Sequence, residues 1–176
     1  MPMVVTLSLP HLKKGATMSI VPIIMGSKSD LKHGQAIADA LAEFGIASEI
    51  RVASAHKAPR FALEVLAGYE SDPQPKVYIT VAGRSNALSG LVDGAVAAPV
   101  IACPPYSDRY GGADVFSSLR MPSGIAPAVV LEPSGAALLA AKILSLAEPA
   151  LRERVARAQQ AATETIMADD RSLRDA

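Results

Sequence analysis

Short strand-like runs alternate along this chain with segments whose apolar residues recur every three or four positions. The first run, 20–25, is apolar throughout, which is typical of a parallel strand buried on both faces. The segment after it carries Ile37, Leu41 and Phe44 on the apolar stripe of an amphipathic helix and ends at Gly45. The alternation repeats along the chain, with strands expected at 20–25, 49–52, 77–81, 100–103 and 128–131.

This alternation predicts a doubly wound parallel sheet with helices on both faces, a three-layer α/β/α fold of the flavodoxin-like or Rossmann-like kind. Pro22 favours an edge position or the strand's start for the first run, because proline cannot donate a ladder hydrogen bond. Ser29 or Asp30 can cap the first helix. Further helices are expected near 59–69, through 91–92, near 134–146 and from 149 to about 167.

The last expected helix follows the final strand and has no further crossover to make. Its apolar positions form a thin stripe, whose members are Val155, Ala158, Ala162 and Ile166, and its other faces are polar. Packing on a neighbouring subunit and packing on its own domain both stay open. We therefore divide the chain into a loose extension at 1–18, an α/β domain at 19–148 and a C-terminal helix and tail at 149–176.

The composition narrows the class of protein. A length of 176 residues fits one domain, and with 50% hydrophobic but only 4% aromatic residues its core is aliphatic. Lys+Arg and Asp+Glu both number 17, which gives no support to a nucleic-acid or anionic-membrane surface. A single cysteine, Cys103, excludes an intrachain disulfide framework and favours a reducing cytoplasm. No apolar run approaches the ~20 residues that span a bilayer, and 1–18 has the wrong charge order for a secretory signal.

Polar residues collect where three of the expected strands end. The loop at 26–30 leads into a helix amino terminus, which offers free N–H groups to a phosphate, but it lacks the glycine patterns of nucleoside-triphosphate and dinucleotide sites. Ligands of open α/β sheets bind at the carboxyl ends of the strands. We therefore favour one shared pocket over three ordinary capped turns. The predicted pocket residues are Gly26, Ser27, Ser29, Asp30, Ser54, His56, Lys57, Gly83, Arg84, Ser85 and Asn86.

His56 is the residue in these loops that can exchange a proton near neutral pH, and Lys57 beside it can hold an anion. The loop therefore predicts a site that binds an anionic small molecule and moves a proton on it. His11 and His33 are interpreted as solvated, and Cys103 as a buried core thiol. No histidine or carboxylate cluster has metal-ligand spacing, so no metal is expected.

Four ordered segments resemble the PurE family of purine biosynthesis, over about 20–146. They are Met25-Gly26-Ser27-Lys28-Ser29-Asp30, Ser54-Ala55-His56-Lys57, Ala82-Gly83-Arg84-Ser85-Asn86 and Met121-Pro122-Ser123-Gly124. The family's common bacterial mutases read Ser-Ala-His-Arg-Thr-Pro in the second segment and Gly-Ala-Ala-His-Leu-Pro-Gly in the third. The present residues are instead similar to the second branch, the carboxylase found also as a domain of the animal bifunctional purine enzyme.

The resemblance implies reversible carboxylation of 5-aminoimidazole ribonucleotide by CO2, in the cytoplasm, without a cofactor. It implies that His56 moves the C4 proton, and that the family's octamer, with sites at subunit interfaces, forms here too. Three groups of site residues follow from it: Gly26, Ser27, Ser29, Asp30, Ser54 and Lys57 for the ribose phosphate; Gly83, Arg84, Ser85 and Asn86 for CO2 and the carboxylate; and Met121, Pro122 and Gly124 as further pocket candidates.

Three alternatives stay open. The family's mutase moves a carboxyl group from the N5-carboxyamino form of the same nucleotide, and Lys57 and Arg84 depart from its pattern. A related carboxylase of nickel-pincer cofactor synthesis usually carries a longer amino-terminal region. A non-catalytic nucleotide-binding module is the third alternative, although mere binding does not need the proton donor that His56 supplies.

Overall fold

Five parallel strands form one sheet in the order β2-β1-β3-β4-β5. The computed structural model describes residues 19–175, so the predicted extension at 1–18 lies outside the described residues. The order is that of the flavodoxin-like doubly wound fold, which confirms the predicted fold class. The strands are β1 (Ile20–Met25), β2 (Ala47–Val52), β3 (Tyr78–Val81), β4 (Val100–Ala102) and β5 (Ala128–Val129).

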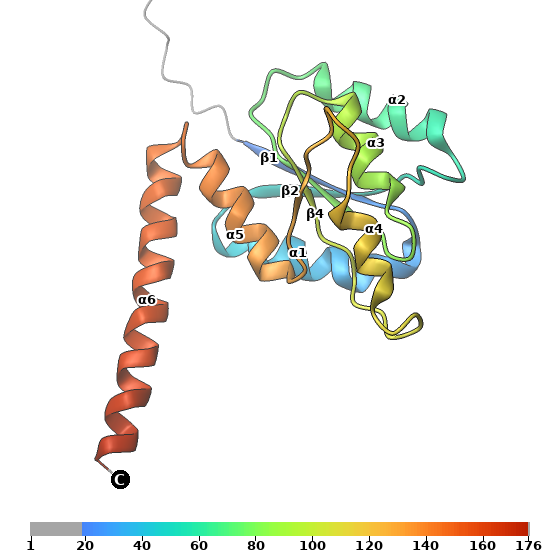
Figure 1. Ribbon diagram of the computed structural model, residues 1–176. Coiled ribbons are helices and arrows are strands. Elements are labelled where there is room, and N and C mark those ends of the chain that lie inside the picture. The colour runs from blue at the N-terminus through green and yellow to red at the C-terminus, as the bar shows by residue number, and fades with distance from the viewer. Residues whose placement is uncertain (1–18, 176) are drawn as a thin grey trace, which may run out of the picture.

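Helices cover both faces of this sheet (Figure 1). Helices α1 (Leu31–Glu43) and α5 (Pro133–Leu144) pack on one face, and α2 (Pro59–Glu70) and α3 (Ala87–Ala95) pack on the other. The remaining helical elements are the short turns η1 (Lys28–Asp30) and η2 (Ala113–Val115), the four-residue helix α4 (Phe116–Leu119) and the long C-terminal helix α6 (Pro149–Arg174). None of the helices within 19–175 is long and apolar enough to cross a membrane.

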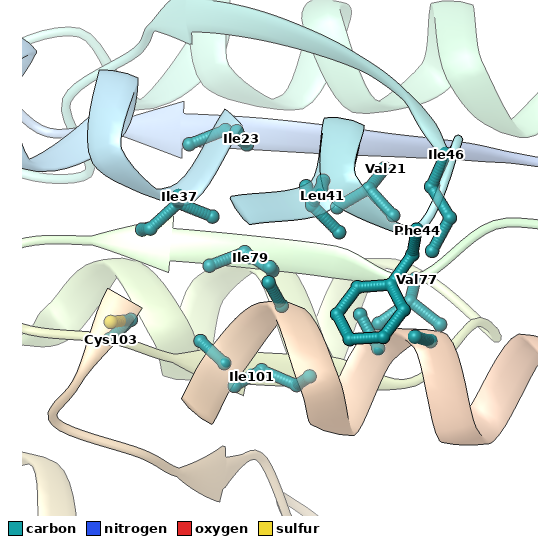
Figure 2. Close-up of a cluster of buried hydrophobic side chains, with 14 of the residues drawn as sticks. Val21, Ile23, Ile37, Leu41, Phe44, Ile46, Val77, Ile79, Ile101 and Cys103 are labelled. Carbon is teal, nitrogen blue, oxygen red and sulfur yellow. The ribbon is translucent and has the colours of Figure 1, made fainter. Parts of the chain in front are cut away.

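The core on the α1 and α5 face is built from the residues that the sequence pattern indicated. Ile37 and Leu41 of α1 are fully buried against the strands, and α5 contributes a face of small alanines. Figure 2 shows Phe44 closing one end of this cluster, with Cys103 at the other end. Cys103 is fully buried, as predicted. Truncating Leu41 to alanine would cost about 2–5 kcal/mol, because the buried site could collapse only in part.

Gly34 of helix α1 faces the side chains of Met25 and Ile23 on the first strand. A Cβ atom built on Gly34 would lie 2.6 Å from the sulfur of Met25, so any larger residue there would force the Met25 side chain to shift. The helix ends at Glu43 with Phe44 as its C-cap residue, and Gly45 adopts φ +65°, the left-handed conformation that glycine accepts without strain. The predicted stop at Gly45 is therefore confirmed. Gly34 therefore affects how α1 packs on β1, and Gly45 marks the end of this helix, which follows the first loop of the site.

The prediction for Pro22 was wrong. Strand β1 is internal, with β2 on one side and β3 on the other, and Pro22 lies in its middle. The ladder to β2 includes a Pro22–Glu49 pair, whereas the ladder to β3 is an isolated bridge at Ile20 that resumes only at Ile23. The sheet therefore tolerates Pro22 by interrupting the ladder on one side, where its missing N–H would have donated.

Helix α6 leaves the domain after its first two turns (Figure 1). Its buried residues are Leu151 and Val155, while Ala158, Ala162 and Ile166 of the predicted stripe are exposed. The helix also continues to Arg174, beyond the predicted end near 167. The sequence left open whether this helix packs on its own domain or on a neighbouring subunit. In the structure it packs on its own domain only as far as Val155.

Candidate active site

One cavity of about 720 Å³ opens at the carboxyl edge of the sheet, and the loops after β1, β2, β3 and β4 line it. The edge position follows from the topology, because the chain turns to opposite sides after β1 and β3 and leaves a crevice between them. The residues around the cavity are Gly26, Ser27, Ser29, Asp30, Ser54, Ala55, His56, Lys57, Ala82, Gly83, Arg84, Ser85, Leu88, Pro105, Tyr106, Ser107, Arg109 and Asp114.

The loop after β1 forms a cluster of hydroxyl and carboxylate groups. Ser27 caps the short η1 turn, because its Oγ accepts a hydrogen bond of 3.2 Å from the Ser29 N–H. The Ser29 hydroxyl lies 2.9 Å from Ser27 Oγ and 3.2 Å from Asp30 Oδ1. The capping prediction holds in part: Asp30 occupies the N-cap position of α1, but its side chain makes no capping hydrogen bond, and the side-chain cap belongs to Ser27 at the start of the preceding η1 turn.

The loop after β2 presents His56 and Lys57 to the cavity. Ser54 shapes this turn, since its Oγ accepts from the Lys57 N–H at 3.2 Å and its carbonyl accepts from the Ala58 N–H at 3.0 Å. His56 and Lys57 are exposed, and the His56 imidazole makes no hydrogen bond to the described residues 19–175. Both ring nitrogens of His56 are therefore free to meet a ligand.

The loop after β3 holds Arg84 in a left-handed conformation. Its φ is 59°, and no other non-glycine residue between 19 and 175 has a positive φ. The Arg84 N–H donates to Asp114 Oδ2 at 3.1 Å. Ser85 beside it is exposed on the cavity wall. The loop therefore offers a guanidinium, a hydroxyl and backbone donors to a bound anion.

The loop after β4 contributes residues that the sequence reasoning missed, namely Pro105, Tyr106, Ser107, Arg109 and Asp114. A signal for them was present, because the predicted fourth strand also ends at this edge of the sheet and the same topological rule applies to its loop. A second, smaller cavity of about 180 Å³ lies beside the first and shares Pro105, Tyr106, Ser107 and Asp114 with it.

Charges of both signs surround the cavity. Lys57, Arg84 and Arg109 bring three cations, and Asp30 and Asp114 bring two carboxylates. Cations at several points suit a ligand with more than one anionic group, and a carboxylate near hydroxyls suits a sugar. Within residues 19–175 no group of three or more His, Cys, Asp or Glu side chains is arranged to hold a metal ion.

Comparison with known proteins places the chain in a family. The family model described as AIR carboxylase matches residues 20–165. The chain belongs to the AIR carboxylase family. A phosphoribosylaminoimidazole carboxylase of Archaeoglobus fulgidus is 52% identical over 166 residues, which cover 94% of this chain and 91% of that protein.

Two further relatives extend the comparison. The crystal structure of Treponema denticola PurE is 52% identical and superposes with a TM-score of 0.87, covering 88% of this chain and 98% of that one. The mouse bifunctional phosphoribosylaminoimidazole carboxylase/phosphoribosylaminoimidazole succinocarboxamide synthetase is 47% identical over 135 residues, or 77% of this chain and 32% of that protein. The predicted family resemblance is thereby confirmed.

Four predicted site residues of this AIR carboxylase family member lie away from the cavity wall. Asn86 is buried behind the loop, where it caps α3 through Ser89 and donates to Ser118 Oγ at 2.8 Å. Met121, Pro122 and Gly124 do not line the cavity. The chain must return to the opposite edge of the sheet before it can enter β5 in parallel, and these three residues lie on that return.

His33 was predicted to be solvated, and the structure corrects this. It is half-buried on α1, with Nε2 3.3 Å from Cys103 Sγ. Burial lowers the pKa of His33 below its ordinary value of 6.5 and raises the pKa of the Cys103 thiol to about 12. The pair is therefore a neutral imidazole against a protonated thiol, and neither residue lines the cavity.

Proposed function

We propose that this protein catalyses the reversible carboxylation of 5-aminoimidazole ribonucleotide by CO2, giving 4-carboxy-5-aminoimidazole ribonucleotide in de novo purine biosynthesis. The observation that carries the proposal is the convergence of His56, three cations and a hydroxyl cluster on one cavity. The volume of about 720 Å³ lies in the range of small-molecule sites. The name of the Archaeoglobus fulgidus relative, 52% identical over most of both chains, supports the same reaction.

The ribose phosphate is assigned to the loops after β1 and β2. Ser27, Ser29 and Lys57 hold the phosphate, and Gly26 and Ser54 shape the backbone around it. Hydroxyl and backbone N–H donors at the start of α1 suit a phosphate because they lie at a helix amino terminus. Asp30 accepts hydrogen bonds from the ribose hydroxyls, for which its carboxylate is already placed at the cavity wall.

The opposite side of the cavity is assigned to CO2 and the new carboxylate. Gly83, Arg84 and Ser85 supply a close backbone, a guanidinium and a hydroxyl. Arg84 is suited to the carboxylate, because a guanidinium binds a planar anion through two parallel hydrogen bonds. Asn86 serves this end from behind, since its side chain is engaged by Ser89 and Ser118.

The reaction follows from the electrons of the ring and from one movable proton. The exocyclic amine makes C4 an enamine-like nucleophile, so C4 attacks the CO2 carbon and a C–C bond forms while one C=O π pair moves onto oxygen. The adduct then carries both a carboxylate and a proton on C4. His56 takes that proton, the C–H pair restores the aromatic ring, and the reverse sequence releases CO2. These steps need no ATP, biotin or metal.

The deciding experiment offers the purified protein two substrates. With 5-aminoimidazole ribonucleotide and bicarbonate as the source of CO2, and without ATP, we expect the 4-carboxy product to accumulate. The N5-carboxyamino isomer, offered in competition, should be turned over poorly. Preferential use of that isomer would instead identify a mutase, and tight nucleotide binding without turnover of either substrate would identify a binding module.

We further propose that the protein works in the cytoplasm as a homo-octamer. The described surface supports an assembly, because Phe61 and Leu63 of α2 are 46% and 44% exposed and Ile166 of α6 is 69% exposed. Subunit contacts that cover these side chains would remove their apolar area from water. Sedimentation velocity at micromolar protein should give a mass near eight chains; a monomer of 18.2 kDa would refute the assembly.

A further inference from the structure

The cavity contains a carboxylate that the proposed ligands do not explain. Asp114 lies at the wall beside Gly83 and Arg84, on the side assigned to CO2 and the product carboxylate. A negative charge there would repel the anion that the reaction creates. Its Oδ2 atom instead accepts the Arg84 N–H at 3.1 Å. Asp114 therefore has a protein partner, and that partner is the strained residue of the loop.

A second contact from the same segment holds the other end of this loop. Ser117 Oγ accepts the Asn86 N–H at 3.0 Å, and it lies 2.8 Å from the Asp114 carbonyl and 3.3 Å from the Arg84 carbonyl. Ser118 Oγ accepts from the Asn86 amide at 2.8 Å. The segment Asp114–Ser118 thus accepts hydrogen bonds from two alternate backbone N–H groups of the loop, those of Arg84 and Asn86.

The other two N–H groups of the loop are left available. Those of Gly83 and Ser85 make no hydrogen bond within residues 19–175, and both residues line the cavity. The Arg84 N–H between them is engaged by Asp114, and the backbone of Arg84 itself has φ 59°. The left-handed backbone is rare for a residue with a Cβ, so it persists only where contacts such as these over-determine it.

We propose that Asp114 is a positioning residue, which fixes the left-handed backbone of Arg84 and thereby aims the Gly83–Ser85 donors at the CO2 end of the site. The inference rests on the proposed carboxylation. Asp114 touches no reacting atom in this assignment and acts through Arg84. Ser117 has the same kind of role at Asn86.

Substitution of Asp114 should weaken the binding of CO2 much more than the binding of the nucleotide. Asp114→Ala should raise the KM for CO2 by at least about 10-fold, the usual effect of losing a hydrogen bond to a charged group. The dissociation constant of the nucleotide should change less than about 2-fold, since its phosphate and ribose are assigned to other loops. Asp114→Asn keeps an acceptor oxygen and should restore most of the affinity for CO2. Equal losses at both ends, or no rescue by asparagine, would overturn the proposal.

A double substitution tests whether Asp114 works through Arg84. Glycine adopts the left-handed conformation without strain, so Asp114→Ala should cost less than about 2-fold in kcat/KM for CO2 when Arg84→Gly is already present. An undiminished penalty in the glycine background would refute the coupling. A readout without turnover keeps this separate from the proposed reaction: amide hydrogen exchange at 83–86 should accelerate in Asp114→Ala and stay near wild type in Asp114→Asn. Unchanged exchange in both variants would refute the positioning role even in an inactive protein.

Discussion

Replacing His56 by asparagine should abolish most turnover without unfolding the protein. Asparagine keeps a similar size and a hydrogen-bonding group but cannot titrate near pH 7. General acid–base groups contribute about 10²–10⁴-fold, which is about 2.7–5.5 kcal/mol of transition-state stabilisation. His56 is exposed and makes no hydrogen bond within 19–175, so the free energy of unfolding should change by no more than about 0.5 kcal/mol.

The assay follows both directions of the reaction. Carboxylation of 5-aminoimidazole ribonucleotide should slow by about 10²–10⁴-fold. When the 4-carboxy product is decarboxylated in D2O, incorporation of deuterium at C4 should slow in parallel. Nucleotide affinity should hardly change, because the phosphate and ribose are assigned to other side chains. A matched control is His33→Asn, which alters the other histidine of the described chain at a position away from the cavity wall.

One result would refute the reasoning. If the His56→Asn protein, verified by mass, retains near-normal turnover in both directions, another group or a water molecule moves the C4 proton. The pairing with His33→Asn guards against a trivial explanation. Equal losses in the two variants would point to damaged folding, and a thermal melt of each would then show it.

Three further outcomes are expected. Lys57→Ala should weaken nucleotide binding by about 10- to 150-fold in calorimetry, through loss of a charge-assisted phosphate contact, whereas Lys28→Ala, on an exposed lysine off the cavity wall, should not. Burial lowers the pKa of His33 below 6.5, so the unfolded chain takes up a proton before the folded protein does as the pH falls. In urea titrations the free energy of unfolding should therefore decrease as the pH is lowered through about 6.5, and this pH dependence should be weaker in His33→Asn. With its pKa raised to about 12, the Cys103 thiol should resist a thiol reagent at about pH 8 until denaturant is added, and rapid labelling of the native protein would contradict its burial.

Much of the fold could be predicted from the sequence because the spacing of its apolar residues distinguishes strands from helices clearly. The apolar runs became parallel strands, and the Ile37–Leu41 stripe became the buried face of α1. The strand-end rule gathered His56, Lys57 and Arg84 around one cavity, as predicted. Local pattern was sufficient in these cases because burial on both faces of a doubly wound sheet leaves few other arrangements.

The remainder depended on contacts between distant residues. Pro22 was misjudged because one interrupted ladder position can be tolerated in an internal strand. The burial of Asn86 depends on Ser118, 32 residues away, and the conformation of Arg84 on Asp114, 30 residues away. The contact of His33 with Cys103 spans 70 residues. No propensity or periodicity encodes such pairs, since they arise only when loops of different strands meet.

The departure of α6 from the domain gives the chain two thermodynamic parts. Up to Val155 the helix shares the domain's packing, and its unfolding belongs to the cooperative transition of the core. Beyond that point it is held by its own backbone and by pairs such as Gln160–Glu164, which stabilise a helix by only a few tenths of a kcal/mol. A single chain in dilution would therefore lose its last turns gradually on warming, well before the sheet melts. Any partner surface that covers Ile166 would merge the two transitions into one.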